Sequence, residues 1–210
     1  MSPSHILAHR GLWSRAEQKN TREALGLALS RGFGLETDVR DHGSELVISH
    51  DPPKAGALLV RDLLEEYRRL DARGMLALNI KADGLAEELD RLLQAFGIER
   101  TFAFDMSVPD MLQYHQRKMS YFSRRSELEP HVVSYQECAG IWLDAFQTDW
   151  YKSDTILDLL AASKQVAVVS PELHGRDRQG VWQMLRQIHD PAGQLLCCTD
   201  YPQELLNWMS

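Results

Sequence analysis

The sequence has 210 residues, of which 44% are hydrophobic and 25% are charged, and its formal net charge is −7. This balance is typical of a soluble globular protein, and the length suits one domain over residues 1–210. The acidic charge disfavours nucleic acid as a partner, since phosphate backbones are bound by clustered Lys and Arg. No run approaches the roughly 18 apolar residues of a membrane-spanning helix, so we expect no stable membrane insertion.

Short apolar runs alternate with longer amphipathic stretches along the whole chain. The predicted strands are His5–His9, Gly34–Val39, Met75–Ile80, Thr101–Phe104, Met119–Phe122, Gly140–Leu143, Gln165–Val169 and Gln194–Cys198. The predicted helices are Thr21–Ser30, Val60–Leu70, Leu85–Phe96, Asp154–Ser163, Gly180–His189 and Gln203–Met209. A further short strand, Glu45–Ser49, is predicted in a hairpin after the second strand.

Eight strands that alternate with helices predict a parallel sheet, and eight units allow the sheet to close as a (β/α)8 barrel. The main alternative is an open doubly wound sheet, which needs fewer strands. Its glycine-rich phosphate-binding pattern is absent after the first strand, where the chain reads His9-Arg10-Gly11-Leu12-Trp13. The sequence therefore predicts a single TIM barrel with a small extra hairpin after strand two.

Polar residues follow nearly every predicted strand, and in a barrel these strand ends meet on the face where active sites are built. They are His9 and Arg10, Glu36 to Asp38, Asn79 to Lys81, Asp105, Asp144, Glu172 with His174, and Asp200. An Asp or Ser at such a position is often the N-cap of the next helix, and we favour capping for Asp200 and Ser107. For Asp105 and Asp144, a cap and a role in the site are equally supported.

Glu36 and Asp38 are two residues apart, so on a strand both side chains point to the same face. Two neighbouring carboxylates repel each other, and both stay ionised most easily with a cation between them. Mg²⁺ or Ca²⁺, which prefer oxygen ligands, would suit this position. An exposed edge strand with alternating acids is disfavoured, because the run from Phe33 to Val39 is typical of a barrel wall.

His9 and His50 are far apart in the sequence, but the strands that carry them are neighbours in a barrel. Two histidines that titrate near neutrality can share the acid and base roles of phosphodiester cleavage. A lone histidine is usually structural, whereas a pair beside two carboxylates and Arg10 favours catalysis.

Four blocks of sequence follow one another: His9-Arg10-Gly11, Asn20-Thr21, Gly34-x-Glu36-x-Asp38-Val39 and Val47-x-x-His50-Asp51. In order and spacing they resemble the N-terminal signature of the glycerophosphodiester phosphodiesterases. The end of the chain, Thr199-Asp200-Tyr201-Pro202, is similar to that family's turn after strand eight. The resemblance spans nearly the whole chain; it is strongest over residues 6–51 and weakest from about 106 to 194.

The resemblance implies a metal-dependent phosphodiesterase that hydrolyses a small phosphodiester, by default a glycerophosphodiester. It implies that His9 and His50 are the general acid and base, and that Arg10 and Lys81 bind phosphate oxygens. The implied cofactor is a divalent cation, either Mg²⁺ or Ca²⁺, which would neutralise charge on the phosphate. The implied metal ligands are Glu36, Asp38 and Asn79.

Three features depart from the family pattern. Asn79 stands where the family has a glutamate, and its uncharged amide should weaken cation binding. Lys19 replaces an acidic residue near the mouth of the barrel. The segment from Val169 to Arg176 lacks the family's aromatic motif, and there Glu172 and His174 are candidates to contact the substrate. A plain polar loop between strand and helix is an equally supported interpretation of that segment.

Two alternatives remain open for the function. With a reduced metal set, the barrel could be a phosphodiester lyase that uses a hydroxyl of its substrate and releases a cyclic phosphate. It could also be a non-catalytic barrel that binds a phosphoryl ligand. The intact histidines, Arg10 and carboxylate pair disfavour this last alternative, because losing one ligand weakens metal affinity rather than ending the chemistry.

The three cysteines indicate a reducing compartment. Cys138, Cys197 and Cys198 are odd in number and lack the spacing of a zinc site, so we expect buried thiols. The first residues show no basic stretch followed by an apolar core, and a secretory signal is therefore not expected. Together these features predict a cytoplasmic protein.

Overall fold

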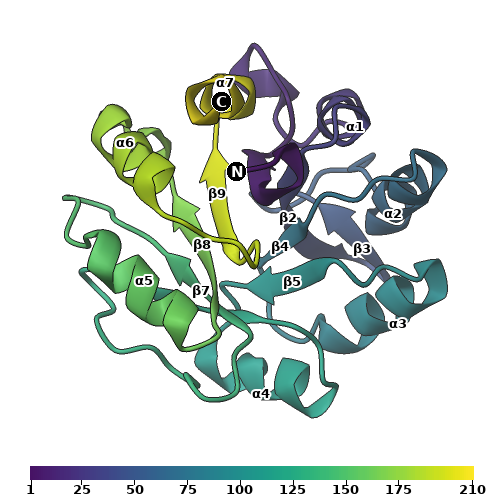
Figure 1. Cartoon of the computed structure of the whole chain (residues 1–210). Helices are drawn as coiled ribbons and strands as arrows, with labels where there is room; N and C mark the ends of the chain where they lie inside the picture. The colour runs from purple at the N-terminus through teal and green to yellow at the C-terminus, as the bar shows by residue number, and fades with distance from the viewer.

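The computed structural model describes residues 1–210, and its nine strands are surrounded by seven α-helices (Figure 1). The strands are β1 (Ile6–His9), β2 (Gly34–His42), β3 (Glu45–Ile48), β4 (Leu76–Ile80), β5 (Thr101–Phe104), β6 (Phe122–Arg125), β7 (Gly140–Leu143), β8 (Gln165–Val169) and β9 (Leu195–Thr199). The helices are α1 (Arg22–Ser30), α2 (Val60–Arg69), α3 (Ala86–Phe96), α4 (Val108–Gln116), α5 (Ser153–Ala161), α6 (Gln179–Gln187) and α7 (Pro202–Met209). Short 3-10 turns cover Pro3–His5, Ala16–Gln18 and Pro171–His174.

The strands form one sheet in the order β5-β4-β2-β1-β9-β8-β7-β6, and all of these neighbours are parallel. Its two ends meet through a single bridge between Ala103 and Tyr121, where the Ala103 amide donates to the Ser120 carbonyl at 3.0 Å. The sheet thus forms a nearly closed (β/α)8 barrel, as predicted. The extra strand is also confirmed, since β3 pairs antiparallel with β2.

Two apolar layers hold the barrel together because successive strand residues point to opposite faces. The inner layer contains Leu7, Ala77, Phe102, Phe104, Phe122, Trp142, Ala167, Val169, Leu196 and Cys198. Within it, Phe102 stacks on Phe122 with ring centroids 3.6 Å apart, and Phe104 stacks on Trp142 at 3.9 Å. A larger layer of 43 buried residues lies between the sheet and the helices. The interior is therefore packed, which leaves the strand ends to carry chemistry.

The third quarter of the chain differs from the sequence-based prediction. Strand β6 begins at Phe122, where the predicted strand ends, and α4 was not predicted. Ser107 is the N-cap of α4, as predicted, because its Oγ accepts from the Asp110 amide at 3.3 Å. No helix follows β6, and residues 126–139 connect it to β7. The barrel therefore has seven α-helices around eight parallel strands.

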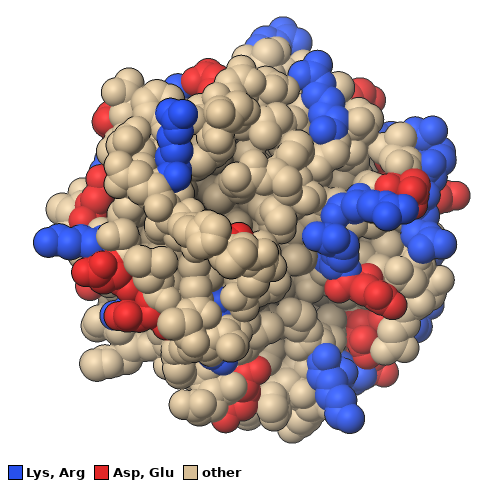
Figure 2. Space-filling model, in the orientation of Figure 1, with Lys and Arg blue, Asp and Glu red and all other residues tan.

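Charged side chains of opposite sign lie close together on much of the surface. On the face shown in Figure 2, Lys and Arg stand beside Asp and Glu, and neither kind forms a large patch. Arg22 with Asp62 at 2.7 Å and Arg69 with Glu66 at 2.6 Å are examples of such pairs. None of the helices has the length and apolar character needed to cross a membrane.

Candidate active site

His9 and Asp200 lie together at the carboxyl ends of the adjacent strands β1 and β9. The Nδ1 atom of His9 is 2.5 Å from Oδ1 of Asp200, and the Lys19 ammonium is 3.4 Å from the other oxygen. The prediction that Asp200 caps a helix is wrong. Helix α7 begins at Pro202, and its N-cap, Tyr201, has no capping bond from a side chain. Asp200 instead points at His9.

The protonation of this pair follows from its surroundings. Burial lowers the pKa of His9, and this effect outweighs the opposing effect of Asp200. Burial alone would raise the pKa of Asp200, but the hydrogen bond from His9 and the charge of Lys19 lower it. A neutral His9 therefore donates its Nδ1 hydrogen to the Asp200 carboxylate. Its Nε2 keeps a free lone pair, 3.8 Å from Glu36 Oε2.

Three buried oxygens converge at the ends of β2 and β4. Asp38 and Asn79 occupy paired positions of the two strands, and Glu36 shares the face of Asp38 two residues earlier. Glu36 Oε2, Asp38 Oδ1 and Asn79 Oδ1 have no hydrogen-bond partner, and the Lys81 ammonium lies 3.4 Å from Asp38 Oδ1. Buried acceptors are rarely left unpaired, and a hard cation is the kind of group that would satisfy three of them. These residues thus fit a divalent ion, with two carboxylates and one amide.

The Asp38 carboxylate is also the meeting point of two cations. Arg10 Nε lies 2.8 Å from its Oδ2, and Lys81 Nζ lies 3.4 Å from its Oδ1. The Asn20 amide donates to Oδ2 at 2.8 Å, and Thr37 fixes that amide by donating to its oxygen at 2.8 Å. Because a single carboxylate faces both cations, they keep positive charge available to a phosphate.

Burial raises the pKa of Glu36 to about 8, and the neighbouring charge of Asp38 adds to the effect. The carboxyl is 1% exposed, so its ionised form loses nearly all its contact with water. Without a cation, Glu36 therefore holds a proton at neutral pH.

The turn after β1 is shaped to place Arg10 over the mouth. Arg10 has φ of +58°, an uncommon left-handed conformation for a residue with a side chain. Gly11 follows with φ of +98°, and a Cβ there would come within 2.6 Å of the Ala24 backbone. The His9-Arg10-Gly11 triplet thus requires glycine at its third position.

His50 lies beside this centre without joining its hydrogen-bond network. It follows Ser49, whose amide donates to the Asp38 carbonyl at 3.0 Å, so the hairpin returns the chain at His50 to the level of Asp38 within β2. Its side chain is 48% exposed and bonds Asp51 at 2.9 Å. No hydrogen bond or ion pair joins His50 to His9.

Glu172 holds the ends of β8 and β9 together from inside the mouth. Its Oε1 accepts from the Thr199 hydroxyl at 2.5 Å and from the Asp200 amide at 3.1 Å. Its Oε2 accepts from the Ser170 hydroxyl, which in turn accepts from Trp182 Nε1 at 2.8 Å. The carboxylate of Glu172 is thus engaged within the protein, next to the backbone of Asp200.

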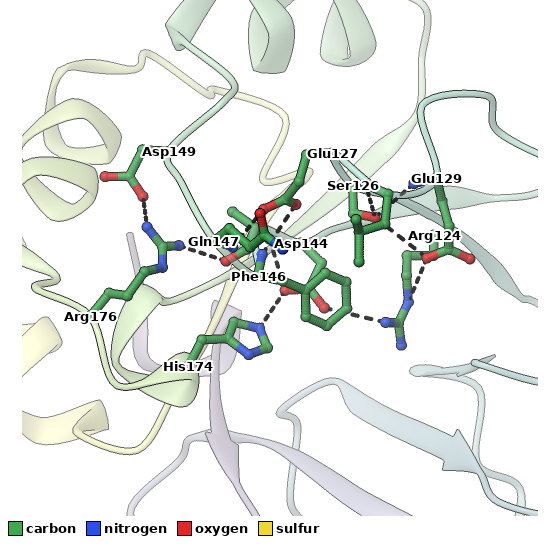
Figure 3. A network of polar contacts seen from close by, with 12 residues as sticks. Arg124, Ser126, Glu127, Glu129, Asp144, Phe146, Gln147, Asp149, His174 and Arg176 are labelled. Atoms are coloured by element: carbon green, nitrogen blue, oxygen red, sulfur yellow. Dashed lines mark hydrogen bonds and ion pairs between the residues drawn. The ribbon is translucent and has the colours of Figure 1, made fainter.

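A second polar cluster lies across the mouth, at the ends of β5 to β8 (Figure 3). His174 Nε2 is 2.7 Å from Asp144 Oδ1, and Arg124 approaches the other oxygen of Asp144 at 3.6 Å. The ring of Phe146 lies between His174 and Arg124. Its centroid is 4.8 Å from the centroid of the His174 ring and 5.3 Å from Cζ of Arg124. Arg124 also pairs with Asp105 at 2.5 Å.

This second cluster includes a residue that the sequence analysis missed. Arg124 was placed beyond a strand expected to end at Phe122, so it was not counted among the strand-end residues. The signal was present in the sequence, since Phe122 and Arg124 are two residues apart and share a strand face. Asp105 and Asp144 cap no helix and instead bind Arg124 and His174.

The mouth therefore has two halves. The half at β1, β2, β4 and β9 combines His9, the unpartnered oxygens of Glu36, Asp38 and Asn79, and the cations Arg10 and Lys81. The half at β5 to β8 pairs its charges internally. An anionic group fits the first half by charge, since Arg10 and Lys81 share the single carboxylate of Asp38.

The fold matches that of solved phosphodiesterase structures. A protein of Galdieria sulphuraria assigned as a glycerophosphodiester phosphodiesterase is 16% identical with a TM-score of 0.75, over 97% of this chain and 96% of that one. An Oleispira antarctica phosphodiesterase in complex with the product sn-glycerol-3-phosphate is 16% identical, with a TM-score of 0.67 over 98% and 96%. The glycerophosphodiester phosphodiesterase of Agrobacterium tumefaciens is 16% identical, with a TM-score of 0.67 over 97% of each chain.

At 16% identity the comparison establishes the fold alone. The family that the sequence motifs resemble is the same one to which the Galdieria sulphuraria and Agrobacterium tumefaciens structures are assigned. No family model matches the chain, and no curated protein matches it in sequence. The comparison thus shows a (β/α)8 barrel fold that the chain shares with these solved structures.

Proposed function

We propose that this protein is a metal-dependent phosphodiesterase that hydrolyses a small phosphodiester of the glycerophosphodiester type. The observation that carries the proposal is the position of His9. It is held by Asp200 with its Nε2 free, 3.8 Å from a carboxyl group of the cation-binding set. The fold shared with known phosphodiesterases supports the same conclusion, and one of these holds sn-glycerol-3-phosphate.

Each residue has a role that follows from its surroundings. Arg10 and Lys81 bind the non-bridging phosphate oxygens through charge-assisted hydrogen bonds. Glu36, Asp38 and Asn79 would hold the divalent cation, which when bound neutralises charge that develops on the phosphate. Their positions and unpartnered oxygens favour this set, whereas the missing third carboxylate predicts modest affinity.

Proton transfer is assigned to the two histidines. His9 Nε2 takes a proton from the attacking water molecule while the water oxygen forms its bond to phosphorus. The bond from phosphorus to the departing alcohol breaks, and that alcohol takes a proton from His50, which is hydrogen-bonded to Asp51 at 2.9 Å. Asp200 fixes the His9 tautomer and stabilises the imidazolium that forms.

The proposal is tested by turnover of glycerophosphodiesters with Mg²⁺ or Ca²⁺, followed by phosphorus NMR. We expect a phosphomonoester from the wild-type protein and none from the His9→Ala variant, with both proteins folded. A lasting cyclic phosphate would identify a lyase instead. Undiminished activity in excess chelator would contradict the metal requirement, and absence of turnover with every phosphodiester would contradict the enzyme.

A further inference from the structure

A pocket of about 730 Å³ opens beside the phosphate-binding half of the mouth. It lies at the carboxyl ends of β4, β5 and β6 and against the start of α4, and its wall includes Lys81. The Lys81 ammonium is also 3.4 Å from Asp38, so the pocket begins where the phosphate centre ends. Pockets of about 300–1,000 Å³ enclose drug-sized ligands, and a glycerol group would leave most of this one empty.

Much of the wall is apolar and deformable. Met106, Met111 and Phe122 form part of its inner surface, and each is buried. Methionine side chains are unbranched and adapt to chains of varied shape. Some charged groups of the wall are paired: Arg124 binds Asp105 at 2.5 Å and approaches Glu129 at 3.6 Å (Figure 3). The wall thus offers an apolar stretch beside these ion pairs.

Exposed apolar side chains gather at the rim of this pocket. Of the seven large hydrophobic residues that are exposed on the chain, two line the pocket, Val108 (54%) and Val133 (44%). Leu112 (57%) and Leu128 (63%) are exposed on the same two segments of the chain but do not line the pocket. Single exposed hydrophobic residues are ordinary, but a group around one pocket indicates an apolar ligand.

The space exists because of how the barrel closes. Strands β5 and β6 share only the bridge between Ala103 and Tyr121, and no helix follows β6 to cover this side. Residues 126–139 form the outer wall in place of a helix. The pocket is therefore built into the architecture of this chain rather than formed by one side-chain rotamer.

We propose that this pocket holds the unbranched hydrocarbon chain of an amphiphilic phosphodiester, whose phosphate lies between Arg10 and Lys81. The inference rests on the proposed function, because it takes the phosphate position from it. It names the substrate class: a phosphodiester with one hydrocarbon chain on an alcohol group. Continuity with Lys81 favours a chain attached to the phosphate over an unrelated apolar partner.

The inference is tested by calorimetric titration of the wild-type protein with alkylphosphocholines, from butyl to dodecyl, as monomers in chelator. Phosphorus NMR checks that each ligand stays intact. We expect Kd to fall by about two- to fourfold for each added methylene until the pocket is filled. A Kd that does not change with chain length would overturn the inference.

Rim variants locate the effect. Val108→Asp and Val133→Asp should reduce the dependence on chain length, and their exposed positions leave the fold intact. Leu157→Asp is the matched control, since Leu157 is 42% exposed on α5 outside the pocket. An equal loss in the control would mean non-specific adsorption. If the rim variants lost binding to phosphatidylcholine vesicles but kept binding to the monomers, the exposed residues would form a membrane-binding surface. Equal loss in the control and this vesicle result would each refute the pocket.

The test separates this inference from the proposed function. Turnover of short glycerophosphodiesters together with a flat chain-length series would retain the enzyme and reject the chain pocket. Chain-dependent binding without turnover of any phosphodiester, short or long, would reject the enzyme and retain a pocket for amphiphiles.

Discussion

His9 Nδ1 and Asp200 Oδ1 lie 2.5 Å apart although 191 residues separate them in the chain. The contact exists because β1 and β9 are adjacent in the barrel, so their carboxyl ends coincide. It joins the two ends of the chain at the proposed reaction centre and determines which nitrogen of His9 is free.

Replacing Asp200 by Asn should therefore disturb the tautomer of His9 rather than the fold. We expect Asp200→Asn to lower kcat by about 100-fold or more, with a small change in KM. Nitrogen NMR of His9 should report a shifted tautomer balance. Asp158→Asn, an exposed change on α5, is the control and should retain full activity. A variant with normal kcat would exclude Asp200 from catalysis.

Glu172 should act through Asp200 instead of through the substrate. Glu172→Ala removes the acceptor for the Asp200 amide and for two hydroxyls, so the free energy of unfolding should fall by about 1–3 kcal/mol. We expect kcat to fall with it, and Glu172→Gln to restore part of both. If KM rises alone while stability is unchanged, Glu172 contacts the substrate directly, as the sequence analysis predicted.

The fold could be predicted because its two signals are local in the sequence. These are the alternation of apolar runs with amphipathic stretches and the polar residues that follow the strands. Hydrophobic runs of four to six residues located seven of the eight barrel strands. They failed at β6, where the apolar run precedes the strand and the strand itself continues into Ser123-Arg124-Arg125. That strand is held by its pairing with β7, a tertiary contact that no local pattern contains.

The same limit explains which site residues were found. Glu36 and Asp38 were placed correctly on one face because strand periodicity alone determines it. Asp200 was misassigned because its partner, His9, is at the other end of the chain, and an Asp before a helix is ordinarily a cap. Only the closure of the barrel brings the two together. The register between β2 and β4 likewise places Asn79 beside Asp38.

His50 is predicted to be essential for turnover but not for stability. Its side chain is 48% exposed, so His50→Ala should change the free energy of unfolding by less than about 0.5 kcal/mol. Turnover should nevertheless fall by about 100-fold or more if His50 protonates the departing alcohol. His189→Ala, another exposed histidine, is the matched control. Retained activity in His50→Ala would assign the acid to a different group.

Asn79→Asp should tighten cation binding and lower the thermal stability of the protein without the cation. A third carboxylate adds charge to the site, so the Kd for Mg²⁺ should fall by about tenfold or more. In chelator the same carboxylate is buried beside Glu36 and Asp38, and thermal unfolding should occur at a lower temperature. Asn207→Asp on the surface of α7 should change neither quantity. Unchanged Mg²⁺ affinity would place the cation elsewhere.

The raised pKa of Glu36 predicts how cation binding depends on pH. Below about pH 8 the buried carboxyl holds a proton, which must leave before the oxygen can bind a cation. Mg²⁺ binding at pH 7 should therefore release about one proton, measurable by calorimetry in buffers of different ionisation enthalpy. The apparent affinity should rise with pH and level off above about 8. Glu36→Gln should abolish the proton release, and its persistence there would contradict the assignment.

The raised pKa of Glu36 also determines whether the free energy of unfolding rises or falls with pH when no cation is bound. Between about pH 4.5 and about 8 the unfolded chain has released the Glu36 proton, while the folded protein still holds it. The folded state binds more protons, so this group's contribution to the free energy of unfolding declines as pH rises through that range. Denaturant titrations in chelator should show the decline in the wild-type protein and a flatter profile in Glu36→Gln. Saturating Mg²⁺ should remove the decline, because Glu36 is then ionised in both the folded and the unfolded state over this range.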